Sequence, residues 1–146
     1  MLSVQSFARL PPEPGSVRDA RRQVGQTLSR AGHEEWADDA VLAVSEVVTN
    51  VVLHARTDCE VAVCVTADDA RVSVRDFSPL PPVHRQHSQY ATTGRGIPLV
   101  TALSTDFGIT PLGSHGKVVW FTLTGLHPSD DAVADALRSR PQSPHG

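Results

Sequence analysis

The stretch AVSEVVTNVVLHA, residues 43–55, decides the fold of this chain. Its apolar residues, together with Ala40 just before the stretch, recur at spacings of three and four, so they lie on one face of a helix. These residues are Ala40, Val44, Val47, Val48, Val51 and Ala55. Valine is a weak helix former because its branched side chain restricts χ1. A helix this rich in valine must be stabilised by burial, so we expect a core helix over residues 34–55.

Three polar residues border this apolar face, namely Glu46, Asn50 and His54, each four positions from the next. Side chains at that spacing lie above one another on a helix. A carboxylate can polarise a hydroxyl or a water, and a carboxamide oxygen can ligate a hard cation such as Mg²⁺. A solvated helix face is the commoner meaning of such spacing taken alone. The position of the row against an apolar face favours a functional site.

The remaining periodicity predicts an α+β domain. A loose alternation over residues 2–10 indicates a first strand, and residues 16–31 form an amphipathic helix whose Ser16 and Asp19 resemble a capping box. The later elements that we expect are a β-hairpin at 61–65 and 72–74, a long loop at 76–94, a short helix at 96–104 and strands at 106–111 and 117–123. Early helices and late adjacent strands indicate a two-layer α/β sandwich, with a mixed, mainly antiparallel sheet and helices on one face.

Composition and charge exclude several classes of protein. The 146 residues are 40% hydrophobic and 20% charged, which suits one globular domain. A net charge of −3 gives no basic excess for nucleic acid or an anionic membrane. We find neither a transmembrane span nor a secretory signal, and Cys59 and Cys64 are expected to be free thiols. We therefore expect a cytoplasmic protein with one domain at 1–126 and a partly flexible tail at 127–146.

Two further motifs carry polar chemistry. In VRDFSPLPP, residues 74–82, a strand ends on Asp76, and a carboxylate there can accept a hydrogen bond from an exocyclic amine such as that of adenine. The alternative is an Asp that starts an ordinary turn before Ser-Pro. In TGRGIPLV, residues 93–100, glycines before a helix let backbone amides approach phosphate, and Arg95 can contact its oxygens. The alternative is a plain glycine turn, and each motif is weak alone.

Taken in this order, the motifs resemble the GHKL-type ATP-binding fold, and more narrowly the small members related to anti-sigma factor serine kinases. Residues 43–55 resemble the N box of that family, 74–82 its first glycine box in the D-x-S-P form, 93–100 its second, and GSHGKVVWFTL at 113–123 its closing strand. The resemblance spans roughly residues 5–124. It implies a Bergerat-type two-layer sandwich that binds ATP and Mg²⁺.

The resemblance also implies roles for single residues. Asn50 would ligate Mg²⁺, Glu46 would act as base toward the attacking hydroxyl, and Asp76 would bind the adenine amino group. The phosphates would be held by the residues of the second box, Gly94, Arg95 and Gly96. Val118 departs from the pattern, which usually has a threonine after Gly-Lys. The loss of a neutral hydrogen bond there predicts nucleotide binding weaker by about 0.5–1.5 kcal/mol.

The function implied by the resemblance is an anti-sigma factor with serine/threonine-protein kinase activity, which phosphorylates an antagonist (anti-anti-sigma) protein in a partner-switching system. Its partners would be a sigma factor and that antagonist, and relatives suggest a homodimer. The alternative from another class is a nucleotide-responsive regulator that binds protein partners without phosphotransfer. A third reading is an α+β domain whose motifs have decayed.

Overall fold

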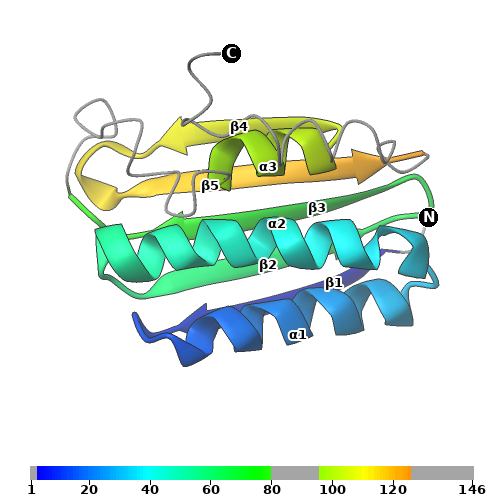
Figure 1. Ribbon diagram of the computed structural model, residues 1–146, viewed down its shortest axis with the longest axis horizontal. Coiled ribbons are helices and arrows are strands. Elements are labelled where there is room, and N and C mark those ends of the chain that lie inside the picture. The colour runs from blue at the N-terminus through cyan, green and yellow to red at the C-terminus, as the bar shows by residue number, and fades with distance from the viewer. Residues whose placement is uncertain (1–2, 80–95, 126–146) are drawn as a thin grey trace, which may run out of the picture.

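The computed structural model describes residues 3–79 and 96–125. The elements, in chain order, are β1 (Val4–Leu10), α1 (Gly15–Arg30), α2 (Ala37–Asn50), β2 (Cys59–Val65), β3 (Asp69–Asp76), α3 (Gly96–Leu103), β4 (Asp106–Pro111) and β5 (Lys117–Thr124). Short helical turns at Glu34–Trp36, Val51–Ala55 and Gly113–His115 join them. Each strand and helix that the periodicity predicts within these residues is confirmed (Figure 1).

The five strands form one open sheet in the order β1-β2-β3-β5-β4. The sequence predicted a mixed, mainly antiparallel sheet, and all four described pairings are antiparallel. The physical reason lies in the connections. Two helices separate β1 from β2, so the chain returns to the end where β1 finished and β2 runs back beside it (Figure 1). Strands β3 and β4 do run in the same direction, but β5 lies between them and pairs antiparallel with both.

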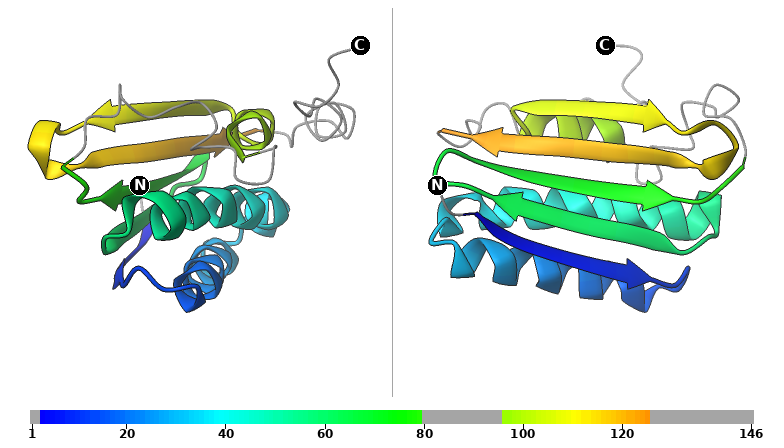
Figure 2. Two further views of the ribbon diagram at one scale, coloured as in Figure 1. Left: turned by 60° about the vertical axis from the view of Figure 1, so that its left-hand side comes forward. Right: turned by 180° about the vertical axis from the view of Figure 1, so that it is seen from behind.

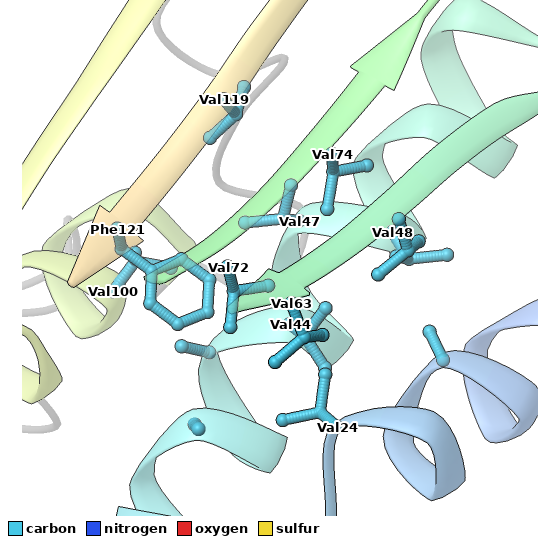
Figure 3. Packing of buried hydrophobic residues seen from close by; sticks show 14 of the residues in the cluster. Val24, Val44, Val47, Val48, Val63, Val72, Val74, Val100, Val119 and Phe121 are labelled. Atoms are coloured by element: carbon cyan, nitrogen blue, oxygen red, sulfur yellow. The ribbon is translucent and has the colours of Figure 1, made fainter. Parts of the chain in front are cut away.

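Helices α1, α2 and α3 cover one face of the sheet, and the other face carries no helix in the described part of the chain (Figure 2). The core fills the space between the two layers (Figure 3). It consists mainly of valines from α2 and from alternate positions of β2 and β3, with Phe121 of β5 fully buried. The α+β sandwich with helices on one face is thus confirmed, and the valines of α2 are held by burial as expected, since Val44 and Val48 are both 0% exposed.

The predicted helix over residues 34–55 is helical throughout but consists of three kinds of turn. A 3₁₀ turn at Glu34–Trp36 leads into α2, and a π-helical turn at Val51–Ala55 follows it. Arg56 ends the run in the left-handed conformation, with φ 57° and ψ 36°. Periodicity locates the apolar face but does not distinguish hydrogen bonds that span three, four or five residues.

The predicted capping box at Ser16 is wrong. The N-cap of α1 is Pro14, and it forms no side-chain capping bond. Ser16 is instead buried in the first turn, where its Oγ donates to the carbonyl of Pro11 at 2.6 Å. This bond ties the start of α1 to the turn that follows β1, because a buried hydroxyl needs a partner wherever the fold supplies one.

Candidate functional site

Glu46 and Asn50 lie one turn apart near the C-terminal end of α2, as their spacing predicts. Both side chains are half-buried. Between them on the helix, Val47 and Val48 are 2% and 0% exposed and anchor this part of α2 in the core. The polar pair therefore borders the core, on a segment held rigidly by apolar packing.

Asn50 is the last residue of α2 and directly precedes the π-helical turn. The N–H of Arg56 closes that turn by donating to the carbonyl of Val51 at 2.8 Å, five residues back. His54 lies within this π-helical turn and is half-buried. Single π turns are rare and occur frequently at functional sites.

Asp76 is the last residue of β3, and only 2% of it is exposed. One carboxylate oxygen, Oδ1, accepts a hydrogen bond from the backbone N–H of Ser78 at 3.1 Å, which is the turn that the sequence offered as an alternative. The other, Oδ2, forms an ion pair with the Nζ of Lys117, which is itself buried. The turn occupies only one of the two carboxylate oxygens. The interpretation of Asp76 as a turn residue therefore does not exclude its interpretation as an acceptor for an adenine amine.

Lys117 is the residue of this site that sequence reasoning missed. It is the first residue of β5 and lies opposite Asp76 in the register of β3 and β5. A sequence signal does exist, since Lys117 is the single lysine among 13 basic residues. Arginine presents a planar fork, whereas lysine has a compact ammonium on a flexible stem, which suits one buried carboxylate oxygen.

Gly116, directly before β5, allows the start of β5 to lie close to the end of β3. Its backbone has φ 102° and ψ −149°, a region that is essentially restricted to glycine. An added Cβ would lie 2.8 Å from the carbonyl carbon of Asp76 and 3.0 Å from the Cα of Phe77. The absence of a side chain at Gly116 thus brings Lys117 within reach of Asp76.

Val118 lies on the opposite face of the sheet from Asp76. It pairs with Arg75, and successive residues of a strand point to opposite faces. Asp76 and Lys117 point toward the helices, while Val118 and Arg75 point to the face without helices. A hydroxyl at position 118 would therefore point away from the Asp76 carboxylate, and the geometry gives no support to the expected loss of affinity.

Cys59 lies directly across the sheet from Asp76, on β2. Burial, followed by the negative charges of Asp58 and Asp76, raises the pKa of the Cys59 thiol from 9.0 to about 11. The thiol therefore stays neutral at physiological pH and contributes no negative charge beside Asp76. It acts as a small apolar residue at this end of the sheet.

Of the predicted phosphate-binding residues, Gly94 and Arg95 lie outside the described residues, and Gly96 begins α3. Helix α3 packs against α2 and buries Leu99, Val100 and Leu103. The C-terminal end of α2, the end of β3 and the start of β5 meet at one end of the molecule (Figure 1). That end brings together the elements that carry Glu46, Asn50 and Asp76, which are distant in the sequence.

Within residues 3–79 and 96–125, histidine, cysteine, aspartate and glutamate nowhere gather in a group of three or more that could hold a metal ion. No helix in these two segments is long and apolar enough to cross a membrane.

Residues 10–123 match the family model described as the histidine kinase-like ATPase domain. The match begins at the end of β1 and extends to the penultimate residue of β5, so it includes α2, the end of β3 and the start of β5. No curated protein matches the chain.

Proposed function

The chain belongs to the histidine kinase-like ATPase domain family, and we propose that it is an ATP-binding regulatory protein with serine/threonine-protein kinase activity. In this proposal it is an anti-sigma factor that phosphorylates a hydroxyl of an antagonist protein in a partner-switching system, and its other partner is a sigma factor. One observation carries the proposal: the C-terminal end of α2 and the end of β3 lie at the same end of the molecule (Figure 1). The first carries the half-buried pair of Glu46 and Asn50, and the second carries the buried carboxylate of Asp76.

The donors and acceptors at this end fit ATP. A carboxylate has about four lone-pair sites. Among the described residues, Asp76 uses two of them, for the N–H of Ser78 and the ammonium of Lys117. It retains acceptor capacity for the exocyclic amine of adenine. Lys117 and Ser78 hold the carboxylate in one orientation, so little rotational freedom is lost when the amine binds.

The residues on α2 fit Mg²⁺ in the same way. Magnesium keeps several waters and binds through one or two protein oxygens together with phosphate oxygens. The carboxamide oxygen of Asn50 is such a ligand, and the rigid packing of Val47 and Val48 fixes its helix. When bound, Mg-ATP supplies a phosphoryl group whose developing charge the metal neutralises.

Glu46 is proposed as the base. Its carboxylate would take the proton of the attacking hydroxyl as that oxygen bonds to the γ-phosphorus, while the bond to the leaving ADP breaks. Glu46 lies one turn from Asn50, so the base and the metal ligand share one rigid helix. This arrangement limits the misalignment of the two groups during phosphoryl transfer.

Calorimetric titration with ATP tests the binding part of the proposal. We expect binding that weakens when Mg²⁺ is omitted or when Asn50→Ala is titrated. Asp38→Asn, an exposed change in the first turn of the same helix, should bind as the wild type does. The absence of binding at millimolar Mg-ATP would refute the proposal.

ADP formation from Mg-ATP, with water as acceptor, tests the role of Glu46. Glu46→Gln should slow this reaction by about 10²–10⁴-fold, the usual contribution of general base catalysis, with ATP affinity retained. An unchanged rate in Glu46→Gln would remove Glu46 from the mechanism. ATP binding with no turnover in the wild type would instead favour a nucleotide-responsive regulator without phosphotransfer.

A further inference from the structure

Strand β1 is an open edge of the sheet. It pairs with β2 alone among the described strands. Its sequence, VQSFARL, contains no proline, and its one charged residue, Arg9, forms ion pairs with Asp58 and with Glu60 of β2. Proline and unpaired charges are among the features that usually protect an edge from further pairing. The opposite edge strand, β4, is protected in this sense because it begins with an exposed Asp106 and ends at Pro111. The backbone groups of β1 that point away from β2 can therefore accept another strand.

A groove of about 310 Å³ runs between β1 and α1. Ser6 of β1 lies in it and accepts hydrogen bonds from Gln23 Nε2 at 3.0 Å and from Thr27 Oγ1 at 2.8 Å. The other amide atom of Gln23, Oε1, is buried and accepts no hydrogen bond from the described residues.

The helix wall of this groove is basic. Helix α1 carries four arginines and one aspartate, although the whole chain has a net charge of −3. The four are Arg18, Arg21, Arg22 and Arg30. All four are exposed, and none forms an ion pair within residues 3–79 and 96–125. Arg22 and Arg30 line the groove itself, together with Asp19, so the charged residues of its lining carry a net positive charge. A partner that lies along β1 therefore meets net positive charge on the helix side.

The other side of β1 is apolar at its centre. Phe7 is 64% exposed and points to the face of the sheet without helices. A second hollow, of about 290 Å³, adjoins it and is lined in part by Ala62 and Cys64 of β2. Successive side chains of an added strand would point alternately to Arg22 and Arg30 in the groove and to Phe7 on the open face.

We propose that the β1 edge binds an extended segment of a partner protein in which acidic and apolar residues alternate. The segment pairs with β1, directs its acidic side chains to Arg22 and Arg30, and packs its apolar side chains beside Phe7. A second copy of this chain is disfavoured as the occupant, because edge-to-edge pairing of two β1 strands would bring two arginine-rich α1 helices together. This docking site lies outside the end of the molecule that carries Asp76, and it does not depend on nucleotide binding.

Fluorescence anisotropy with a labelled peptide of four valine-glutamate repeats tests the proposal on the full chain. We expect saturable binding that weakens with salt. The double variant Arg22→Ala/Arg30→Ala should bind about tenfold more weakly, as the loss of two partly exposed charge pairs implies. The matched control Arg18→Ala/Arg21→Ala removes the same charge from the same helix outside the groove, and it should lower affinity by less than about threefold, since charges there are screened. Amide hydrogen exchange should show new protection in β1.

Several outcomes would overturn the proposal. One is that the valine-glutamate peptide does not bind. Another is that a version with a central proline, which cannot complete a strand, binds equally well. If oligothymidylate binds as tightly as the peptide, the arginines form a general patch for polyanions. If the two double variants lose the same affinity for the peptide, the groove is not the binding site. Sedimentation showing a dimer that the peptide dissociates would assign the edge to a second copy of this chain.

Discussion

Replacing Gly116 by alanine should destabilise the protein more than any other glycine-to-alanine change in the β4–β5 turn. Alanine at this position must adopt φ 102° and ψ −149°. Its Cβ would lie 2.8 Å from the carbonyl carbon of Asp76 and 3.0 Å from the Cα of Phe77. These are backbone atoms in and directly after β3, so no side-chain rotation relieves the contact.

The expected magnitude follows from these two effects. The backbone conformation costs about 1–3 kcal/mol for a residue other than glycine, and forcing an extra carbon into a packed region costs about 1–3 kcal/mol. We therefore expect the free energy of unfolding to fall by about 2–6 kcal/mol, a large share of the about 5–15 kcal/mol of a typical domain. Gly113→Ala is the control, because Gly113 has φ 62° and no atom within 4 Å of its added Cβ. The free energy of unfolding of Gly113→Ala should fall by about 1–2 kcal/mol.

Urea unfolding followed by tryptophan fluorescence measures both variants, and the comparison requires equal m-values. ATP calorimetry on the folded proteins adds a second readout. Gly116→Ala displaces the backbone of Asp76 and should weaken nucleotide binding, while Gly113→Ala should not. If Gly116→Ala unfolds at the same urea concentration as Gly113→Ala, or at a higher one, the argued contact between β5 and β3 is wrong.

Three further predictions concern the same sheet. Lys117→Met leaves Asp76 buried without its cation and should lower the free energy of unfolding in urea by about 3–5 kcal/mol. The double variant Asp76→Asn/Lys117→Met should recover part of that loss, and an equal loss in the single and the double variant would contradict the ion pair. The pKa of the Cys59 thiol is raised to about 11, so the unfolded chain releases this proton first as pH rises above 9.0. The free energy of unfolding should then fall between pH 9 and 11 by about 2–3 kcal/mol, and Cys59→Ala should lack this component. Gly108→Ala places a Cβ 2.6 Å from Cε2 of the Trp120 ring; it should cost about 1–3 kcal/mol and shift tryptophan emission, and an unchanged spectrum would contradict the contact.

Most of the fold could be predicted from the sequence because its local patterns have clear periods. The apolar spacing of three and four located α1 and α2, and the alternation of two located β2, β3 and β5. The predicted strand bounds at 106–111 agree with β4. Local periodicity reports which face of an element is buried, and the buried faces of Val44 and Val61 follow it.

The candidate site could be predicted only in part. The placement of Glu46 one turn from Asn50 was predicted because both lie on one helix, where spacing alone places one above the other. Lys117 was missed because its partner, Asp76, is 41 residues away and meets it only through the pairing of β3 with β5. The same pairing of β3 with β5 decides that Val118 points to the face of the sheet opposite Asp76. No local sequence pattern contains this pairing.

The sequence by itself determined the helices, the strands and the apolar face of each, because these depend on interactions within a few residues. The hairpin of β2 and β3 also followed from the sequence, but only the tertiary structure placed β1 beside β2 and β5 between β3 and β4. The sheet is therefore antiparallel throughout its described pairings. The tertiary structure also decided that Lys117 compensates the buried charge of Asp76, and that β1 remains an open edge beside a basic helix. Burial and charge compensation depend on contacts between distant segments, and those contacts exist only once the sheet has formed.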